Sequence, residues 1–132
     1  MASEDSQNDS PQGEISLRVL AMPADANPGG HIFGGWVMGR MDIAGAIHAA
    51  NYTSGRMVTI AVDAMKFHKP VHVGDEVTCY TRVDRTGRTS ISMQVETWVR
   101  RRHNASPVKV TEGRFTYVAV DDGGVPIALL KK

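Results

Sequence analysis

The first candidate for chemistry in this sequence is one acid inside a long apolar segment. Asp42 is the only acid in GGWVMGRMDIAGAIHAA, residues 34–50. A charged side chain in such a segment is a poor helix former and is costly to bury. Arg40 and His48 lack the three- or four-residue spacing that would pair them with it along a helix. The residues alone leave two interpretations open, a solvent-exposed acid or a functional carboxylate.

The loop that precedes this segment is rich in glycine. Five glycine or asparagine residues fall close together: Asn27, Gly29, Gly30, Gly34 and Gly35. Glycines before a helix let backbone N–H groups converge on an anion or a polarised carbonyl, although an ordinary turn would look the same. Amides near Gly35, with Asp42 two turns further along, would place an oxyanion site beside a carboxylate. That combination suits acyl transfer to water.

The remaining reactive residue types predict no second site. The five histidines have no metal-ligand spacing, so we predict no metal site and interpret each as a surface or loop residue. They are His31, His48, His68, His72 and His103. Cys79 is the only cysteine and shows no sign of activation, which favours a buried bystander. Ser90 and Ser92 have no G-x-S-x-G context, which argues against a serine hydrolase.

A basic cluster is the last charged feature of the sequence. Arg100, Arg101 and Arg102 end a predicted strand, and Lys109 follows soon after. A solvated strand end is the simpler interpretation of such a run. Arginine is also suited to hold phosphate groups with paired donors, so a phosphorylated ligand is the competing interpretation.

Hydrophobic periodicity predicts the elements that would position these residues. Residues 34–50 are long enough for a helix of four turns, with small or apolar residues on nearly every side, which predicts a buried helix. Its glycines indicate that a partner subunit or a ligand comes close to the backbone. Strands are predicted by alternating patterns in five further segments, residues 14–21, 57–67, 76–85, 88–102 and 108–120.

One long helix and about five strands, mostly in hairpin succession, predict an α+β fold. The economical arrangement is a curved antiparallel sheet wrapped around the helix, which is the hotdog fold. We expect a disordered N-terminal tail at residues 1–13 and a single domain at residues 14–132. The edges of such a sheet favour strand pairing between two subunits.

Composition excludes several classes of protein. The chain has 132 residues, of which 42% are hydrophobic, enough for the core of one domain. A formal charge of +1 argues against a general nucleic-acid binder. The polar N-terminus has no signal-peptide pattern, and no apolar stretch approaches the roughly 20 residues of a membrane span. With a single cysteine, these features lead us to expect a cytoplasmic protein that acts away from membranes.

The run MPADANPGGHIFGGWVMGRMDIAG closely resembles the signature of the acyl-CoA hydrolase family of hotdog thioesterases, the short bacterial type. The resemblance continues through GRMVTIAVDAMKFHKPVHVGDEV, TGRTSISMQVETWVRR and FTYVAVDDGGVP, and covers nearly the whole chain from about Leu17. It implies hydrolysis of acyl-CoA to a free acid and CoA. No further cofactor is implied, because CoA is part of the substrate. It also implies sites at a dimer interface and assembly of dimers into a hexamer.

Specific residues follow from this resemblance. Asp42 matches the family's catalytic carboxylate, and Asn27 matches an asparagine that some members supply from the neighbouring subunit. The backbone at Gly34 and Gly35 matches the part that holds the thioester carbonyl. Turns resembling the family's nucleotide-contacting regions add substrate-binding candidates to the basic cluster. The full set of these candidates is Arg56, Thr59, Arg88, Ser90, Arg100, Arg101, Arg102 and Lys109.

Two other functions compete with hydrolysis. Hotdog hydratases and dehydratases also act on acyl thioesters, but they pair an acid with a histidine, and no such motif accompanies Asp42. A non-catalytic acyl-CoA sensor would need an output domain, for which a chain of 132 residues leaves no room. Release of free thiol distinguishes hydrolysis from both.

Overall fold

The computed structural model describes residues 10–101 and 106–130, and its elements lie where hydrophobic periodicity predicts them. The helix α2 runs over Gly34–Ala49, and two short 3-10 helices, η1 at Pro23–Asp25 and η2 at Ala50–Tyr52, lie before and after it. The five strands are β1 (Glu14–Leu20), β2 (Arg56–Phe67), β3 (Glu76–Thr86), β4 (Ser90–Arg100) and β5 (Val108–Val120). The predicted helix and all five predicted strands are confirmed, with boundaries shifted by one or two residues.

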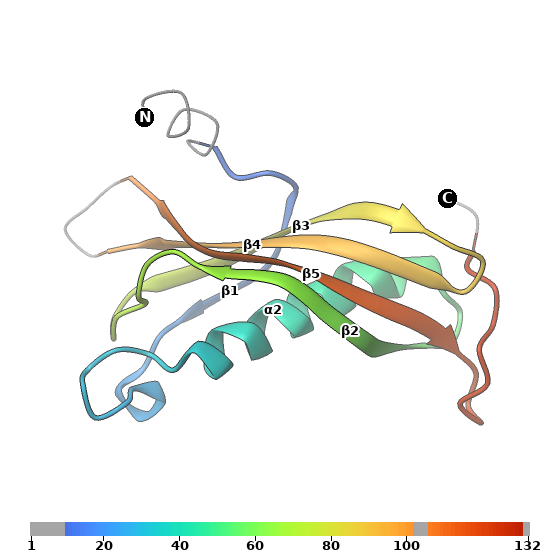
Figure 1. Cartoon of the computed structure of the whole chain (residues 1–132), viewed down its shortest axis with the longest axis horizontal. Helices are drawn as coiled ribbons and strands as arrows, with labels where there is room; N and C mark the ends of the chain where they lie inside the picture. The colour runs from blue at the N-terminus through green and yellow to red at the C-terminus, as the bar shows by residue number, and fades with distance from the viewer. Residues whose placement is uncertain (1–9, 102–105, 131–132) are drawn as a thin grey trace.

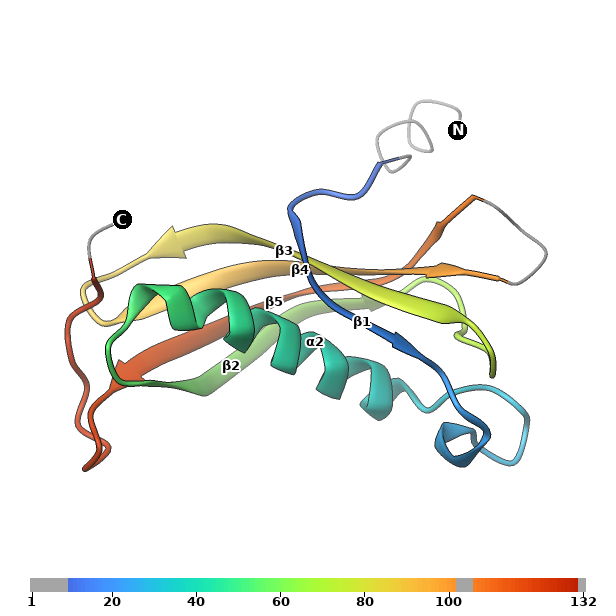
Figure 2. The same ribbon diagram turned by 180° about the vertical axis from the view of Figure 1, so that it is seen from behind.

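The strands form one antiparallel sheet in the order β1-β3-β4-β5-β2. Figures 1 and 2 show the curved sheet and α2 lying along one of its faces, so the predicted arrangement of a sheet around one helix is confirmed. The short strand β1 and the long strand β2 are the two edges. The N-terminal side of α2 lies at the end of the sheet where β4 ends and β5 begins.

The core lies between α2 and the concave face of the sheet. Val37, Met41 and Ala44 of the helix are buried against β3, β4 and β5. Predicted alternation along β4 is confirmed, since Ile91, Met93, Val95 and Val99 all lie in this core. The opposite face of β4 is also partly covered, because Glu96 is buried and accepts a hydrogen bond from the Trp98 indole at 2.9 Å.

The prediction of a helix buried on every side is wrong for the single chain. Ile43 and Ile47 are 44% and 52% exposed, because α2 contacts the sheet along only one stripe. The outward side of α2 stays apolar although nothing in the described chain covers it.

The N-terminal segment that precedes β1 is described from Ser10. The backbone N–H of Gln12 donates to the Glu96 carboxylate at 3.3 Å, which fastens this segment to the sheet. The first nine residues of the predicted tail lie outside the described part of the chain. Among the described residues, no helix is long and apolar enough to cross a membrane.

Candidate active site

Asp42 lies half-buried in the middle of α2 and is held by the edge strand β2. The hydroxyl of Thr59 donates to the Asp42 carboxylate with an O–O distance of 2.8 Å. Neither Arg40 nor His48 pairs with it, as the spacing predicts: Arg40 stacks over Trp36, and His48 bonds to Thr81 at 2.8 Å. The Asp42 carboxylate therefore points toward the edge strand β2.

The backbone of Asp42 has a second strand partner. Tyr117 of β5 lies directly opposite Thr59 in the register of the β2–β5 pair. Its hydroxyl donates to the Asp42 carbonyl oxygen at 2.7 Å. Burial, the nearby Asp42 carboxylate and this hydrogen bond raise the pKa of the Tyr117 phenol well above its ordinary value, so it stays a donor at neutral pH.

The N-terminus of α2 leaves backbone amides available. Phe33 occupies the N-cap position, and no side chain caps the helix there. The first amides bonded back to the cap belong to Trp36 and Val37, which donate to the Phe33 carbonyl. The N–H groups of Gly34 and Gly35 precede them and have no partner within the helix. Both glycines are exposed, so an anion or polarised carbonyl can reach these amides.

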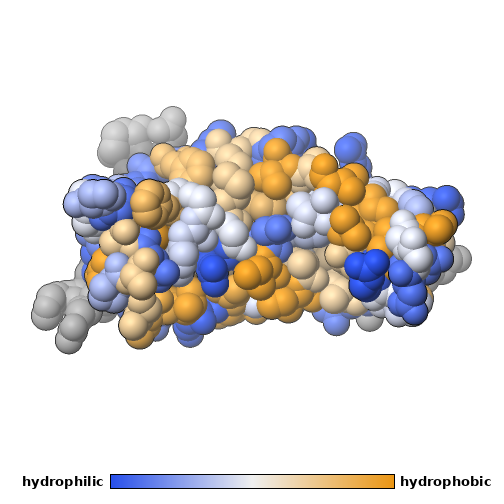
Figure 3. All heavy atoms as spheres, turned by 90° about the horizontal axis from the view of Figure 1, so that it is seen from below, coloured by the Kyte–Doolittle hydropathy of each residue, from blue (hydrophilic) through white to orange (hydrophobic). Residues whose placement is uncertain are grey.

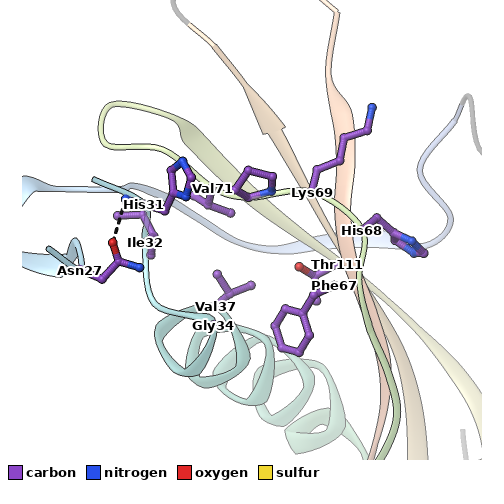
Figure 4. A pocket seen from close by; sticks show the side chains of 11 residues that line it. Asn27, His31, Ile32, Gly34, Val37, Phe67, His68, Lys69, Val71 and Thr111 are labelled. Carbon is purple, nitrogen blue, oxygen red and sulfur yellow. Dashed lines mark hydrogen bonds between the residues drawn. The ribbon is translucent and has the colours of Figure 1, made fainter. Parts of the chain in front are cut away.

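A pocket of about 320 Å³ opens beside this helix terminus. Figure 4 shows it between the start of α2 and the segment that leaves β2, with the Val37 and Phe67 side chains on its inner side. Ile32 and Val71 add apolar lining, and Lys69 lies at the rim with its side chain directed away from the helix. An apolar pocket beside helix amides can receive an acyl group with its carbonyl on those amides.

Asn27 lies at the same pocket and shapes the glycine loop. Its side-chain oxygen accepts the His31 N–H at 3.1 Å, and its backbone N–H donates to the His31 carbonyl at 2.7 Å. Gly30 closes the turn with φ near 90°, a conformation that favours glycine. The structure thus brings Asn27 and Gly34 together at one pocket.

Asp42 does not line this pocket. It lies eight residues beyond Gly34, which is roughly 12 Å along a helix axis. No hydrogen bond joins Asp42 to Asn27 in the described part of the chain. One chain therefore presents the carbonyl-binding half and the carboxylate half of the predicted site at two separate places.

The predicted substrate-binding residues fall into two groups at opposite ends of the sheet. Arg56 and Arg88 are exposed at the end of the sheet where β5 finishes, and Ser90 is half-buried beside them. No acid pairs with either guanidinium in the described ranges. Thr59 lies further along β2, where its hydroxyl is committed to Asp42.

The basic cluster lies at the other end, and its described members are paired with acids. Arg100 lies 3.5 Å from Glu76. Arg101 lies 3.4 Å from the buried Asp75 and donates to the Pro70 carbonyl at 3.1 Å. Lys109, the third described member of the cluster, donates to Glu112 at 3.2 Å and lies 3.9 Å from Glu96. These contacts give the cluster a structural role in the single chain, and Arg102 lies outside the described residues.

Cys79 and three of the histidines have contacts elsewhere in the fold. Burial raises the pKa of the Cys79 thiol to about 11, so the buried bystander predicted from the sequence fits this environment. His48 was predicted as a surface or loop residue, and that is wrong: it packs in α2 against Thr81 and Tyr52. His31 and His72 stack on each other in loops, with ring centroids 4.9 Å apart. The described His, Cys, Asp and Glu side chains form no group of three that could hold a metal.

Sequence reasoning missed two of the contacts that define Asp42. Thr59 was considered only as a nucleotide contact, and Tyr117 was not considered at all. Both depend on which way β2 and β5 face and on their mutual register, which a single strand pattern does not fix. The pocket residues Phe67 and Val71 were also missed, because they approach the start of α2 only in the folded chain.

A sequence model of the thioesterase superfamily matches residues 29–105. The acyl-CoA thioester hydrolase YciA of Salmonella typhimurium is 51% identical over 123 residues, covering 90% of this chain and 92% of that protein. A hexameric thioesterase from Yersinia pestis is 52% identical and superposes with a TM-score of 0.87, over 92% of this chain and 99% of that one.

A further solved structure adds an informative variant. HI0827 is a hexameric broad specificity acyl-coenzyme A thioesterase, solved with an aspartate replaced by alanine. It is 44% identical and has a TM-score of 0.88, with coverage of 92% of this chain and 89% of that one. The shared architecture of a five-stranded antiparallel sheet around one helix is the hotdog fold. The chain belongs to the thioesterase superfamily, among the acyl-CoA thioester hydrolases.

Proposed function

We propose that this protein is an acyl-CoA thioesterase whose active site is shared between two chains. The observation that carries the proposal is the separation of its two halves, with Asn27 and Gly34 at one pocket and Asp42 two turns away. Relatives named as acyl-CoA thioester hydrolases at about half identity support the substrate class. Two chains can supply both halves to one thioester, whereas one chain cannot.

The edge strand β2 supports a two-chain site. Only Met57 and Met65 of its twelve residues are half-buried, and the other ten are exposed. Four of the exposed side chains are large and apolar, namely Val58, Ile60, Val62 and Phe67. Figure 3, which views the molecule from below, shows apolar side chains spread over this side. A long apolar edge strand has unpaired backbone N–H and C=O groups and favours pairing with another strand. A second β2, related by a two-fold axis, would pair with it antiparallel.

The glycines of α2 fit the same arrangement. A Cβ at Gly35 or Gly39 would meet nothing within 4 Å in the single chain, so the chain itself gives no reason for glycine there. Two-fold symmetry makes the two helices antiparallel, and small residues let their backbones approach. If they cross near Gly39, Asp42 of each chain faces the start of the other helix. We further propose that such dimers assemble into a hexamer, as the Yersinia relative does.

The chemistry follows from this geometry. The amides of Gly34 and Gly35 hold the thioester carbonyl oxygen and stabilise the negative charge that develops on it, with the Asn27 side chain beside them. Asp42 of the second chain either takes a proton from the attacking water or attacks the carbonyl to form an anhydride. In both routes the C–S bond breaks, the sulfur leaves as the CoA thiol, and water supplies the oxygen of the free acid.

The nucleotide end of CoA requires cations. Arg56 and Arg88 have no acid partner among the described residues and lie at the end of the sheet remote from the pocket of their own chain. In the antiparallel dimer that end of the second chain approaches the pocket. We therefore propose that Arg56, Arg88 and Ser90 contact the CoA phosphates, ahead of the acid-paired Arg100, Arg101 and Lys109.

A panel of acyl-CoA esters from acetyl to palmitoyl tests the proposed function. Hydrolysis is expected to release one CoA thiol and one free acid per turnover for at least part of the panel. A hydratase would change the acyl chain without releasing thiol, and a sensor would bind the ester without turnover. Either of those results would overturn the proposal. The buried Cys79 thiol is expected not to contribute to the thiol signal.

A further inference from the structure

The carboxylate proposed above is attached to the sheet twice, and both attachments come from one cross-strand pair. Thr59 of β2 and Tyr117 of β5 are direct partners in the register. Thr59 binds the Asp42 side chain, and Tyr117 binds the Asp42 backbone carbonyl. These two hydrogen bonds hold Asp42 in place relative to two neighbouring strands. The Tyr117 bond restrains rotation of the helix, and the Thr59 bond restrains rotation of the Asp42 side chain.

The Tyr117 contact is not an ordinary part of the helix. In a regular α-helix the Asp42 carbonyl already accepts the amide four residues further along, so the phenol adds a second donor. The Tyr117 side chain is fully buried, and a buried hydroxyl needs a partner. Any rotation of α2 that moved this carbonyl would leave the phenol without the partner it has here.

Gly45 makes this contact possible. A Cβ at Gly45 would collide with the Tyr117 hydroxyl and would lie only 3.0 Å from the ring carbon that bears it. A Cβ at Gly39, six residues earlier in the helix, would meet nothing within 4 Å. A buried helical glycine costs stability relative to alanine. Gly45 is the helical glycine that the fold itself requires, and its role is to admit the phenol.

We propose that Tyr117 is a positioning residue for Asp42, acting through the helix backbone and admitted by Gly45. This inference rests on the proposed function. The Tyr117 side chain is fully buried and bonds to the backbone of Asp42, so its effect is on the orientation of the carboxylate toward the second chain's pocket. Small displacements of a catalytic group lower the rate of the chemical step more than they change substrate binding.

The test compares Tyr117→Phe in two backgrounds. In the wild-type background, kcat for acyl-CoA hydrolysis is expected to fall about tenfold with KM unchanged, because a well-placed base becomes misaligned. In the Asp42→Asn background, Tyr117→Phe is expected to cause no further loss, because the residue it positions has lost its charge. Equal losses in the two backgrounds, or an unchanged kcat in the first, would overturn the proposal.

Two more variants separate positioning from general stability. Gly45→Ala should lower kcat as Tyr117→Phe does, although alanine is the better helix former, and a normal kcat in this variant would count against the proposal. Tyr80→Phe, a half-buried tyrosine of β3, is the matched control and should keep wild-type kcat. Failure of the proposed function is distinguishable, since Asp42→Asn alone would then retain activity whatever Tyr117→Phe does.

Discussion

At the scale of the residue, Asp42 and the helix amides have opposite requirements. The carboxylate is held by side chains from β2 and β5, whereas the amides of Gly34 and Gly35 are left without partners by their place at a helix start. A base needs orientation, and an oxyanion site needs open donors directed at one point. The glycines at the helix start are visible in the sequence, whereas Thr59 and Tyr117, which orient Asp42, are found only in the folded chain.

The Gly34 amide can be removed without changing the helix. Gly34 is the first helical residue, where proline is tolerated, and Phe33 before it has the extended conformation that a following proline needs. Gly34→Pro is expected to lower kcat by roughly 10²-fold, as loss of one oxyanion donor does. Gly34→Ala keeps the N–H and is the matched control, needing only a small shift of Phe67, whose ring lies 3.3 Å from the added Cβ. Equal kcat values in the two variants would remove Gly34 from the oxyanion site.

The candidate phosphate-binding cations form two groups, those paired with acids and those without an acid partner among the described residues. This difference allows the proposed contact with the CoA phosphates to be tested. Replacing Arg56 and Arg88 together by alanine is expected to raise KM about tenfold or more with little change in kcat, because remote phosphates contribute uniform binding. Arg100→Ala, which removes an acid-paired guanidinium, is the control and should leave KM unchanged. The reverse pattern in steady-state kinetics would place the phosphates at the other end of the sheet.

At the scale of the element, α2 and all five strands follow from periodicity, because burial of one face imposes a repeat on the local sequence. The partners of Asp42 do not follow from it. β2 has register shifts between Thr59 and Ala61 and between Asp63 and Lys66, and Ala64 has a left-handed backbone with φ of 57°. Each bulge reverses which residues face the helix, so the direction of Thr59 depends on pairing with β5 and cannot be read from β2 alone.

Strand β5 also holds the outer wall of the pocket. The N–H groups of His68 and Lys69 donate to the Val110 carbonyl, and the His68 ring bonds to Glu112 at 2.7 Å. Burial disfavours the charged form of Glu112, but hydrogen bonds from His68 and Lys109 outweigh it and hold its pKa below the ordinary value of 4.5. A depressed carboxylate pKa stabilises the fold above the unfolded-state value, and this stabilisation is lost as the pH falls through the folded-state value.

Glu112→Gln tests this linkage. The free energy of unfolding of the wild type is expected to exceed that of the variant near pH 6, and the difference should shrink below about pH 4.5 as Glu112 becomes protonated. Denaturant titrations of both proteins between about pH 6 and pH 3 measure it. A difference that stays constant into the acid range would show that the charge of Glu112 does not hold the pocket wall.

At the scale of the whole molecule, the exposed β2 edge predicts the assembly. Ile60 is 58% exposed in the single chain, so a charge there does not disturb the core. Ile60→Glu is expected to give monomers in light scattering and no measurable hydrolysis, because each chain then has only half of each site. Ile15→Glu, on the opposite edge strand β1, is the control and should keep the β2-paired dimer unit and its activity. An active monomer of either variant would contradict a site shared between two chains.

The role of Asp42 as the reacting carboxylate is tested most directly by the steady-state hydrolysis of a medium-chain acyl-CoA by Asp42→Asn. The substitution keeps the shape of the side chain and can still accept from Thr59, but it removes the charge. We expect a loss in kcat of roughly 10²-fold or more, the range of a positioned base, with KM, oligomer mass and melting temperature unchanged. A well-folded Asp42→Asn oligomer with near wild-type kcat would contradict it and would make Asp42 a structural acid.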